Sequence, residues 1–89
     1  MVDCTFRTTS GNIKKITFDK NKTMGELIKN YFEEINLMRY YGRVDLFGFI
    51  CNANVIPFDS LEFVGNYFNT DGNNFILARD LNNLIWWNV

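Results

Sequence analysis

The sequence predicts an α+β fold in which one helix packs on a mixed sheet of four to five strands. Alternating apolar and polar residues up to position 18 indicate two paired strands at the start of the chain. An apolar stripe of helical period follows between residues 24 and 35, and short β-rich runs then extend to residue 81. The 89 residues suffice for one domain, and the 47% that are hydrophobic can fill a dense core.

The opening strands are predicted to form a hairpin. In the first strand, one face carries the apolar side chains Val2, Cys4 and Phe6. Residues 8–12 have the composition of a tight loop, in which Gly11 and Asn12 can adopt a positive φ. Residues 13–18 then form the second strand.

The helix begins at a capping box. The Thr23 hydroxyl can accept from the backbone N–H of Glu26, and the Glu26 carboxylate can accept from the N–H of Thr23. The apolar stripe that follows recurs at helical offsets and consists of Met24, Leu27, Ile28, Tyr31, Phe32 and Ile35.

The second half of the chain contains further strands and turns. Residues 44–51 read as a strand, residues 55–56 as a short return strand ended by Pro57, and residues 59–61 as a turn. The last strand is predicted over residues 74–81. Its alternation divides the apolar residues into two sets, Phe75 with Leu77 and Ile76 with Ala78.

Composition excludes several classes of partner. Nine basic and ten acidic residues leave no basic excess for a nucleic acid. No run approaches the roughly 18 apolar residues of a membrane span, so we expect no direct membrane insertion. Cys4 and Cys51 are expected to be buried thiols, with a disulfide between them as the alternative. Two cysteines and no signal-peptide pattern predict an intracellular, cytoplasmic protein in a reducing compartment.

The sequence offers no catalytic constellation. It has no histidine, the commonest general base and metal ligand. The neighbouring Glu33 and Glu34 belong to the polar helix face, and no base can be named for Cys51. We therefore expect a protein that is not an enzyme and binds neither cofactor nor metal.

The order of these segments resembles ubiquitin and the ubiquitin-like domains over residues 1–81. The loop at Thr9–Gly11, the capped helix at Thr23, the strand–turn–strand over residues 49–56, the turn at residues 59–61 and the last strand carry the likeness. The resemblance implies a β-grasp fold. It also implies an exposed apolar patch that binds other proteins, which by position consists of Ile50, Ile76 and Ala78, with Thr9 in the neighbouring loop.

The chain departs from the conjugating members of that family. Those members end in a flexible tail with a Gly-Gly pair, and this sequence contains no such pair. The resemblance therefore implies a non-conjugating member, and we expect a protein-interaction module that is an adaptor or accessory subunit of a larger protein assembly. The alternative is a ubiquitin-like modifier matured from a longer precursor.

Residues 82–89 form an apolar tail after the predicted domain. Its large side chains are Leu84, Ile85, Trp86 and Trp87. Each Trp can bury on the order of 150–250 Å², so exposure of both indoles to water would favour aggregation. Two outcomes remain open: the tail folds back on its own domain, or it docks into a partner protein with a Trp as hot spot.

Overall fold

The computed structural model describes residues 1–68 and 74–85. It contains a hairpin of β1 (Val2–Thr8) and β2 (Ile13–Phe18), followed by the helix α1 (Met24–Glu34). A short 3-10 helix, η1 (Met38–Tyr40), leads to the strands β3 (Phe47–Cys51) and β4 (Asn54–Ile56). A second one, η2 (Val64–Asn66), precedes the last strand β5 (Asn74–Asp80).

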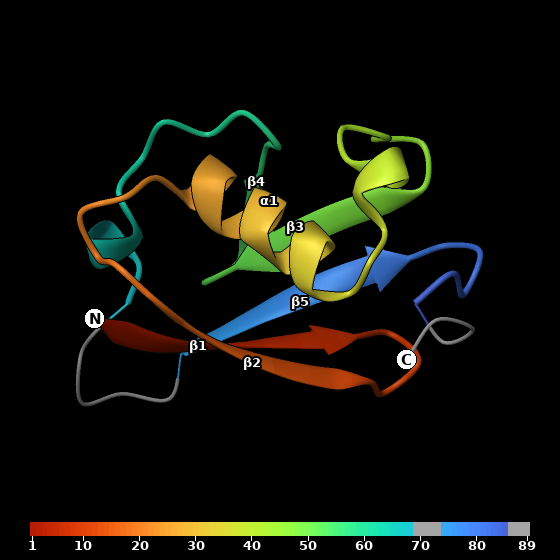
Figure 1. Cartoon of the computed structure of the whole chain (residues 1–89), viewed down its shortest axis with the longest axis horizontal. Coiled ribbons are helices and arrows are strands. Elements are labelled where there is room, and N and C mark those ends of the chain that lie inside the picture. Colours follow the sequence, from red (N-terminus) through yellow and green to blue (C-terminus); the bar gives the residue numbers. More distant parts are fainter. Residues whose placement is uncertain (69–73, 86–89) are drawn as a thin grey trace.

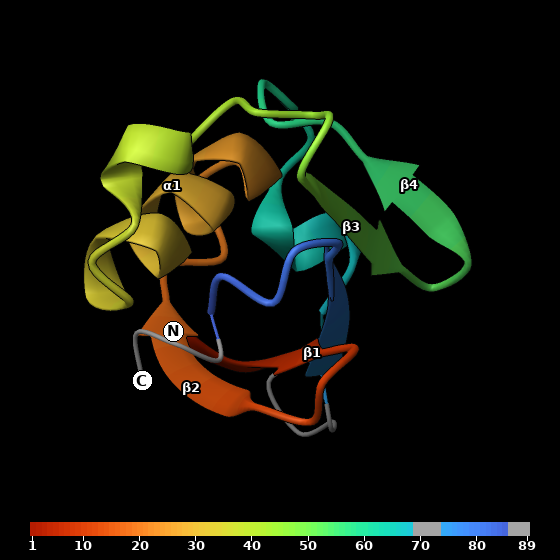
Figure 2. The same ribbon diagram turned by 90° about the vertical axis from the view of Figure 1, so that its right-hand side faces the viewer.

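The strands form one five-stranded sheet in the order β2-β1-β5-β3-β4. The central pair β1 and β5 is parallel, and the other neighbours are antiparallel, so the sheet is mixed. Helix α1 crosses one face of this sheet (Figures 1 and 2). The predicted α+β class, with one helix on a mixed sheet, is confirmed.

Local sequence signals account for both ends of α1. At its start the Thr23 hydroxyl accepts from the Glu26 N–H, and the Thr23 N–H donates to Glu26 Oε1, both at 3.1 Å. At its end Asn36 adopts a left-handed φ of 60°, while the N–H of Leu37 donates to the carbonyl of Phe32. This pattern satisfies the last carbonyls of the helix and turns the chain back towards the sheet.

The core lies between α1 and the sheet. Every residue of the predicted apolar stripe is buried there. The rings of Phe6 and Tyr31 stack with centroids 4.0 Å apart, and Phe32 meets Phe47 edge to face at 5.1 Å. These two ring contacts join α1 to β1 in one half of the sheet and to β3 in the other.

The predicted strand over residues 44–51 begins later than expected. Residues 44–46 form a turn, in which the N–H groups of Leu46 and Phe47 both donate to the carbonyl of Arg43. The guanidinium of Arg43 also pairs with the carboxylate of Asp45 at 2.8 Å. These local bonds compete with strand pairing, so β3 starts at Phe47.

The prediction that Ile76 and Ala78 form an exposed patch is wrong. Both side chains are 0% exposed. The parallel register pairs Ile76 with Phe6 and Ala78 with Thr8, and directly paired residues point to the same sheet face. Because Phe6 faces the helix, Ile76 and Ala78 do so too.

The expectation that Ile85 binds a partner is also wrong, because Ile85 is 1% exposed and belongs to the domain's own core. Leu84, half-buried, packs against the same core. The core therefore extends beyond residue 81, where the ubiquitin-like domain was predicted to end. Trp86 and Trp87 lie outside the described residues.

Candidate protein-binding surface

The face of the sheet opposite α1 carries a row of side chains that crosses all its strands. The strand registers pair Ile13 with Arg7, Arg7 with Leu77, Leu77 with Ile50, and Ile50 with Val55. We call these five residues the outer band. Neighbouring strands lie about 4.8 Å apart, so the band is about 19 Å wide.

The outer band is apolar at each position except Arg7. Ile13, Leu77 and Val55 are exposed and Ile50 is half-buried. Phe75 lies two residues before Leu77 on the same strand face and is also exposed, so it widens the apolar area. Large side chains left in contact with water on one face are typical of a surface that binds another protein.

The charges around the outer band are mainly basic. Arg7 lies within it, while Lys15 and Arg79 occupy outward-facing positions in the adjacent rows. Asp3 is the one acid at the outward positions of the described strands, and its carboxylate accepts from the Thr17 hydroxyl at 2.7 Å. The face therefore complements a partner that is apolar and acidic.

Two of the residues that the sequence singled out for protein binding lie on or beside this face. Ile50 lies in the outer band, and exposed Thr9 lies at the adjoining end of the sheet, where its N–H donates to the carbonyl of Ala78. Phe75 and Leu77 were missed as candidates, although their alternation had already placed them on one face. Only their register with β1 shows that this face is the exposed one.

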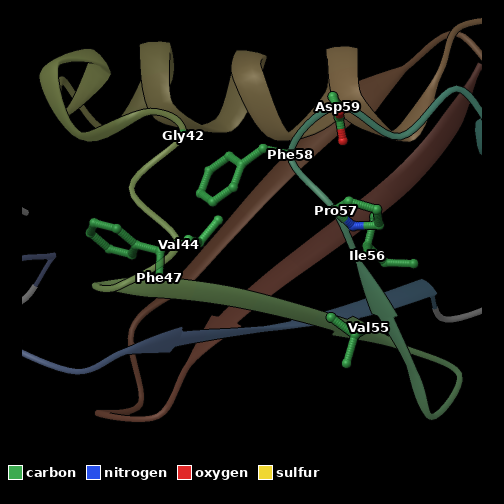
Figure 3. A pocket seen from close by; sticks show the side chains of 8 residues that line it. All are labelled: Gly42, Val44, Phe47, Val55, Ile56, Pro57, Phe58 and Asp59. Carbon is green, nitrogen blue, oxygen red and sulfur yellow. The ribbon is translucent and has the colours of Figure 1, made fainter.

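A hollow of about 520 Å³ adjoins the outer band at its β4 end (Figure 3). Its lining is mainly apolar and consists of Gly42, Val44, Phe47, Val55, Ile56, Pro57, Phe58 and Asp59. Val55 belongs both to this hollow and to the outer band.

The buried cysteines do not provide a nucleophile at neutral pH. Cys4 and Cys51 are free, and burial raises the pKa of Cys4 to about 12 and that of Cys51 to about 11. Because the thiolate is the reactive form, both groups are inert. Within residues 1–68 and 74–85, no group of three or more His, Cys, Asp or Glu residues is arranged to hold a metal ion.

The helices of the described ranges are all too short or too polar to cross a bilayer.

The mixed five-stranded sheet with one helix across it has the ubiquitin-like β-grasp fold. The structure is similar to the crystal structure of the UBL domain of Plasmodium falciparum Dsk2, with a TM-score of 0.65 and 18% sequence identity. The likeness covers 89% of this chain and 96% of that chain, and at this identity it shows the fold alone. No family model and no curated protein matches the sequence.

Proposed function

We propose that this chain is a non-catalytic, ubiquitin-like protein-interaction module that serves as an adaptor or accessory subunit of a larger protein assembly. The observation that supports this proposal is the outer band. Leu77, Ile50 and Val55 lie side by side on adjacent strands, where Leu77 and Val55 are exposed and Ile50 is half-buried.

The partner suited to this surface has apolar side chains flanked by acidic ones. Arg7 interrupts the outer band, and Arg79 lies beside it, so two guanidinium groups face any bound protein. Arginine forms strong bidentate contacts with carboxylates. We therefore expect binding to weaken as the salt concentration rises, because rim charges are screened.

The non-conjugating role is part of the same proposal. The sequence has no Gly-Gly pair, and residues 84 and 85 are held against the domain rather than forming a free extension. The alternative, a modifier matured from a longer precursor, is tested by the intact mass of the native protein. A Gly-ended product or an isopeptide adduct would support the alternative, and an unmodified chain supports the interaction module.

The cytoplasmic location predicted from the cysteines is retained in this proposal. Both thiols are free and buried, as suits a reducing compartment. Microscopy of the tagged native protein tests it, and exclusive location in a secretory compartment would contradict it.

The substitution Leu77→Glu tests the binding surface. We expect it to remove partners recovered by affinity purification and mass spectrometry, because it places a charge in the middle of the outer band. Loss of a hot-spot contact of about 2 kcal/mol lowers affinity roughly 30-fold. Ile50→Ala should weaken binding in the same assay.

Leu61→Glu is the matched control. Leu61 is 84% exposed and Leu77 is 38% exposed, but Leu61 lies outside the sheet. We expect Leu61→Glu to retain the partners that Leu77→Glu loses. If the two variants recover the same partners in the same amounts, the outer band is not the binding surface.

A further inference from the structure

The hollow of about 520 Å³ at the β4 end of the sheet, here called the β4 hollow, lies where β3 and β4 diverge. The antiparallel pairing of these strands ends with Phe49 and Ile56, and the next pair in the same register would be Phe47 with Phe58. Both of these residues line the hollow instead of pairing (Figure 3). Its volume lies in the range of about 300–1,000 Å³ that is typical of ligand sites.

Apolar side chains form the rim and the inner wall of the β4 hollow. Val44, from the turn before β3, is 78% exposed, and Val55, from β4, is 76% exposed. Phe47 and Phe58 are buried, so their rings belong to the inner part of the lining. The exposed valines favour an occupant with an apolar side chain or an aliphatic stem, because its binding removes their surface from water.

The β4 hollow also carries a negative charge. Asp59 is the one charged residue of its lining, and this residue is exposed. The single ion pair among residues 1–68 and 74–85 joins Arg43 to Asp45, so no base in these ranges pairs with Asp59. The charge of the hollow is therefore complementary to a cationic group.

The backbone of β3 adds a second hydrogen-bond acceptor. Cys51 and Asn54 flank a two-residue turn, so they form a hydrogen-bonded pair, and alternation makes Phe49 and Ile56 the next such pair. The same alternation directs the carbonyl of Phe47 to the β4 side of β3, where β4 has no residue opposite it. An occupant with several donors can therefore bond to this carbonyl as well as to the carboxylate.

From these features we infer that the β4 hollow binds an arginine side chain of a partner protein, together with an adjacent apolar side chain. The aliphatic stem packs against Val44 and Val55, while the guanidinium donates to the Asp59 carboxylate and the Phe47 carbonyl. Arginine suits two acceptors beside aromatic rings better than lysine does, because its planar group has five donors and stacks on such rings. The inference rests on the proposed function, since it supposes a protein partner, and it adds a basic contact at the β4 end to the acidic contact expected at Arg7.

A short peptide tests the β4 hollow without the partner. We expect N-acetyl-leucylarginine amide, added at millimolar concentration to the isotope-labelled protein, to shift the backbone amide NMR signals of Val44, Ile56 and Asp59. The neutral N-acetyl-leucylglutamine amide should shift them less at equal concentration. Asp59→Asn should weaken binding of the arginine peptide by about 2- to 5-fold, the range for an exposed ion pair.

Two matched controls separate the β4 hollow from the rest of the surface. Asp3→Asn also removes an exposed carboxylate, but from β1, and it should leave the affinity for the arginine peptide unchanged. Val44→Ser should weaken binding, because it removes part of the apolar rim. Leu61→Ser should not, because Leu61 is 84% exposed but does not line the hollow.

Three results would overturn the inference. One is the absence of shifts at Val44 and Asp59 with the arginine peptide. Another is an equal response to the arginine and glutamine peptides, or equal affinity of Asp59→Asn and the wild type. The third is a set of shifts confined to the outer band and lost in Leu77→Glu, which would assign the peptide to that surface.

The titration also distinguishes this inference from the proposed function. Leu77→Glu should leave the shifts at Val44 and Asp59 unchanged, because Leu77 does not line the β4 hollow. If Leu77→Glu and Leu61→Glu retain the same partners while the arginine peptide still binds at Asp59, the outer band is refuted as the binding surface and the β4 hollow is supported.

Discussion

The buried carboxylate of Asp80 is predicted to hold the end of the chain against the domain. Its Oδ1 accepts from the N–H of Leu84 and its Oδ2 from the N–H of Ile85, and the side chain is buried. In Asp80→Asn an NH₂ group replaces one carboxylate oxygen, so this NH₂ donor faces a backbone N–H donor of Leu84 or Ile85. The variant loses one hydrogen bond to a charged group, worth about 1.5–3 kcal/mol.

This loss can be measured as a lower thermal midpoint. For a domain of 60–100 residues, each kcal/mol corresponds to about 4–8 °C, so we expect a decrease of roughly 6–24 °C. Circular dichroism follows the unfolding, and amide hydrogen exchange by NMR follows Leu84 and Ile85. Exchange of these two amides should accelerate more than exchange of the core strands, because the local contact is broken first.

Asp3→Asn is the control for Asp80→Asn. Asp3 is exposed and accepts from Thr17 through a single oxygen, which the amide retains. Its stability should change by no more than about 0.5 kcal/mol. If Asp80→Asn melts at the wild-type temperature and leaves the Leu84 and Ile85 amides equally protected, Asp80 does not hold the end of the chain.

Two further substitutions test the start of α1. Gly25→Ala would place a Cβ 2.8 Å from the carbonyl oxygen of Ser60, so we expect a net loss of about 1–2 kcal/mol in urea unfolding despite the higher helix propensity of Ala. Gly48→Ala is its control, because the nearest atom lies 3.9 Å away, and equal stabilities of these two variants would contradict the clash. The hydrogen bond from the Thr23 N–H holds the pKa of Glu26 below its usual 4.5. The ionised Glu26 therefore stabilises the folded state above pH 4.5, and this stabilisation is lost as the pH falls through the lowered pKa of Glu26 in the folded protein. Glu26→Gln keeps a hydrogen-bond acceptor but does not titrate, so its urea midpoint should fall less steeply than that of the wild type down to about pH 3. Parallel curves for the two proteins would show that ionisation of Glu26 does not stabilise the fold.

Local structure could be predicted from the sequence where neighbouring residues determine it. The capping box of Thr23 and Glu26 and the apolar stripe of α1 depend on residues within a few turns of one another, and both predictions are confirmed. The strand predicted from residue 44 was wrong at its start, because the pairing of Arg43 with Asp45 favours a turn over an extended chain.

The exposed face of β5 could not be predicted in the same way. Both alternating sets are apolar, Phe75 with Leu77 and Ile76 with Ala78. The alternation alone therefore does not show which set faces the core and which faces water. The choice depends on pairing with β1, about 70 residues earlier in the chain, which turns Ile76 towards α1 and Leu77 outwards. The binding surface proposed here follows from that pairing.

The sequence by itself determined the helix, its cap, the opening hairpin and the absence of histidine chemistry, because each depends on composition or on residues close together in the chain. The tertiary structure alone decided which side chains of β5 meet water and that Ile85 completes the core. These two outcomes depend on contacts between distant segments, in which a parallel register and the hydrogen bonds of Asp80 select one arrangement among several that the apolar pattern allows.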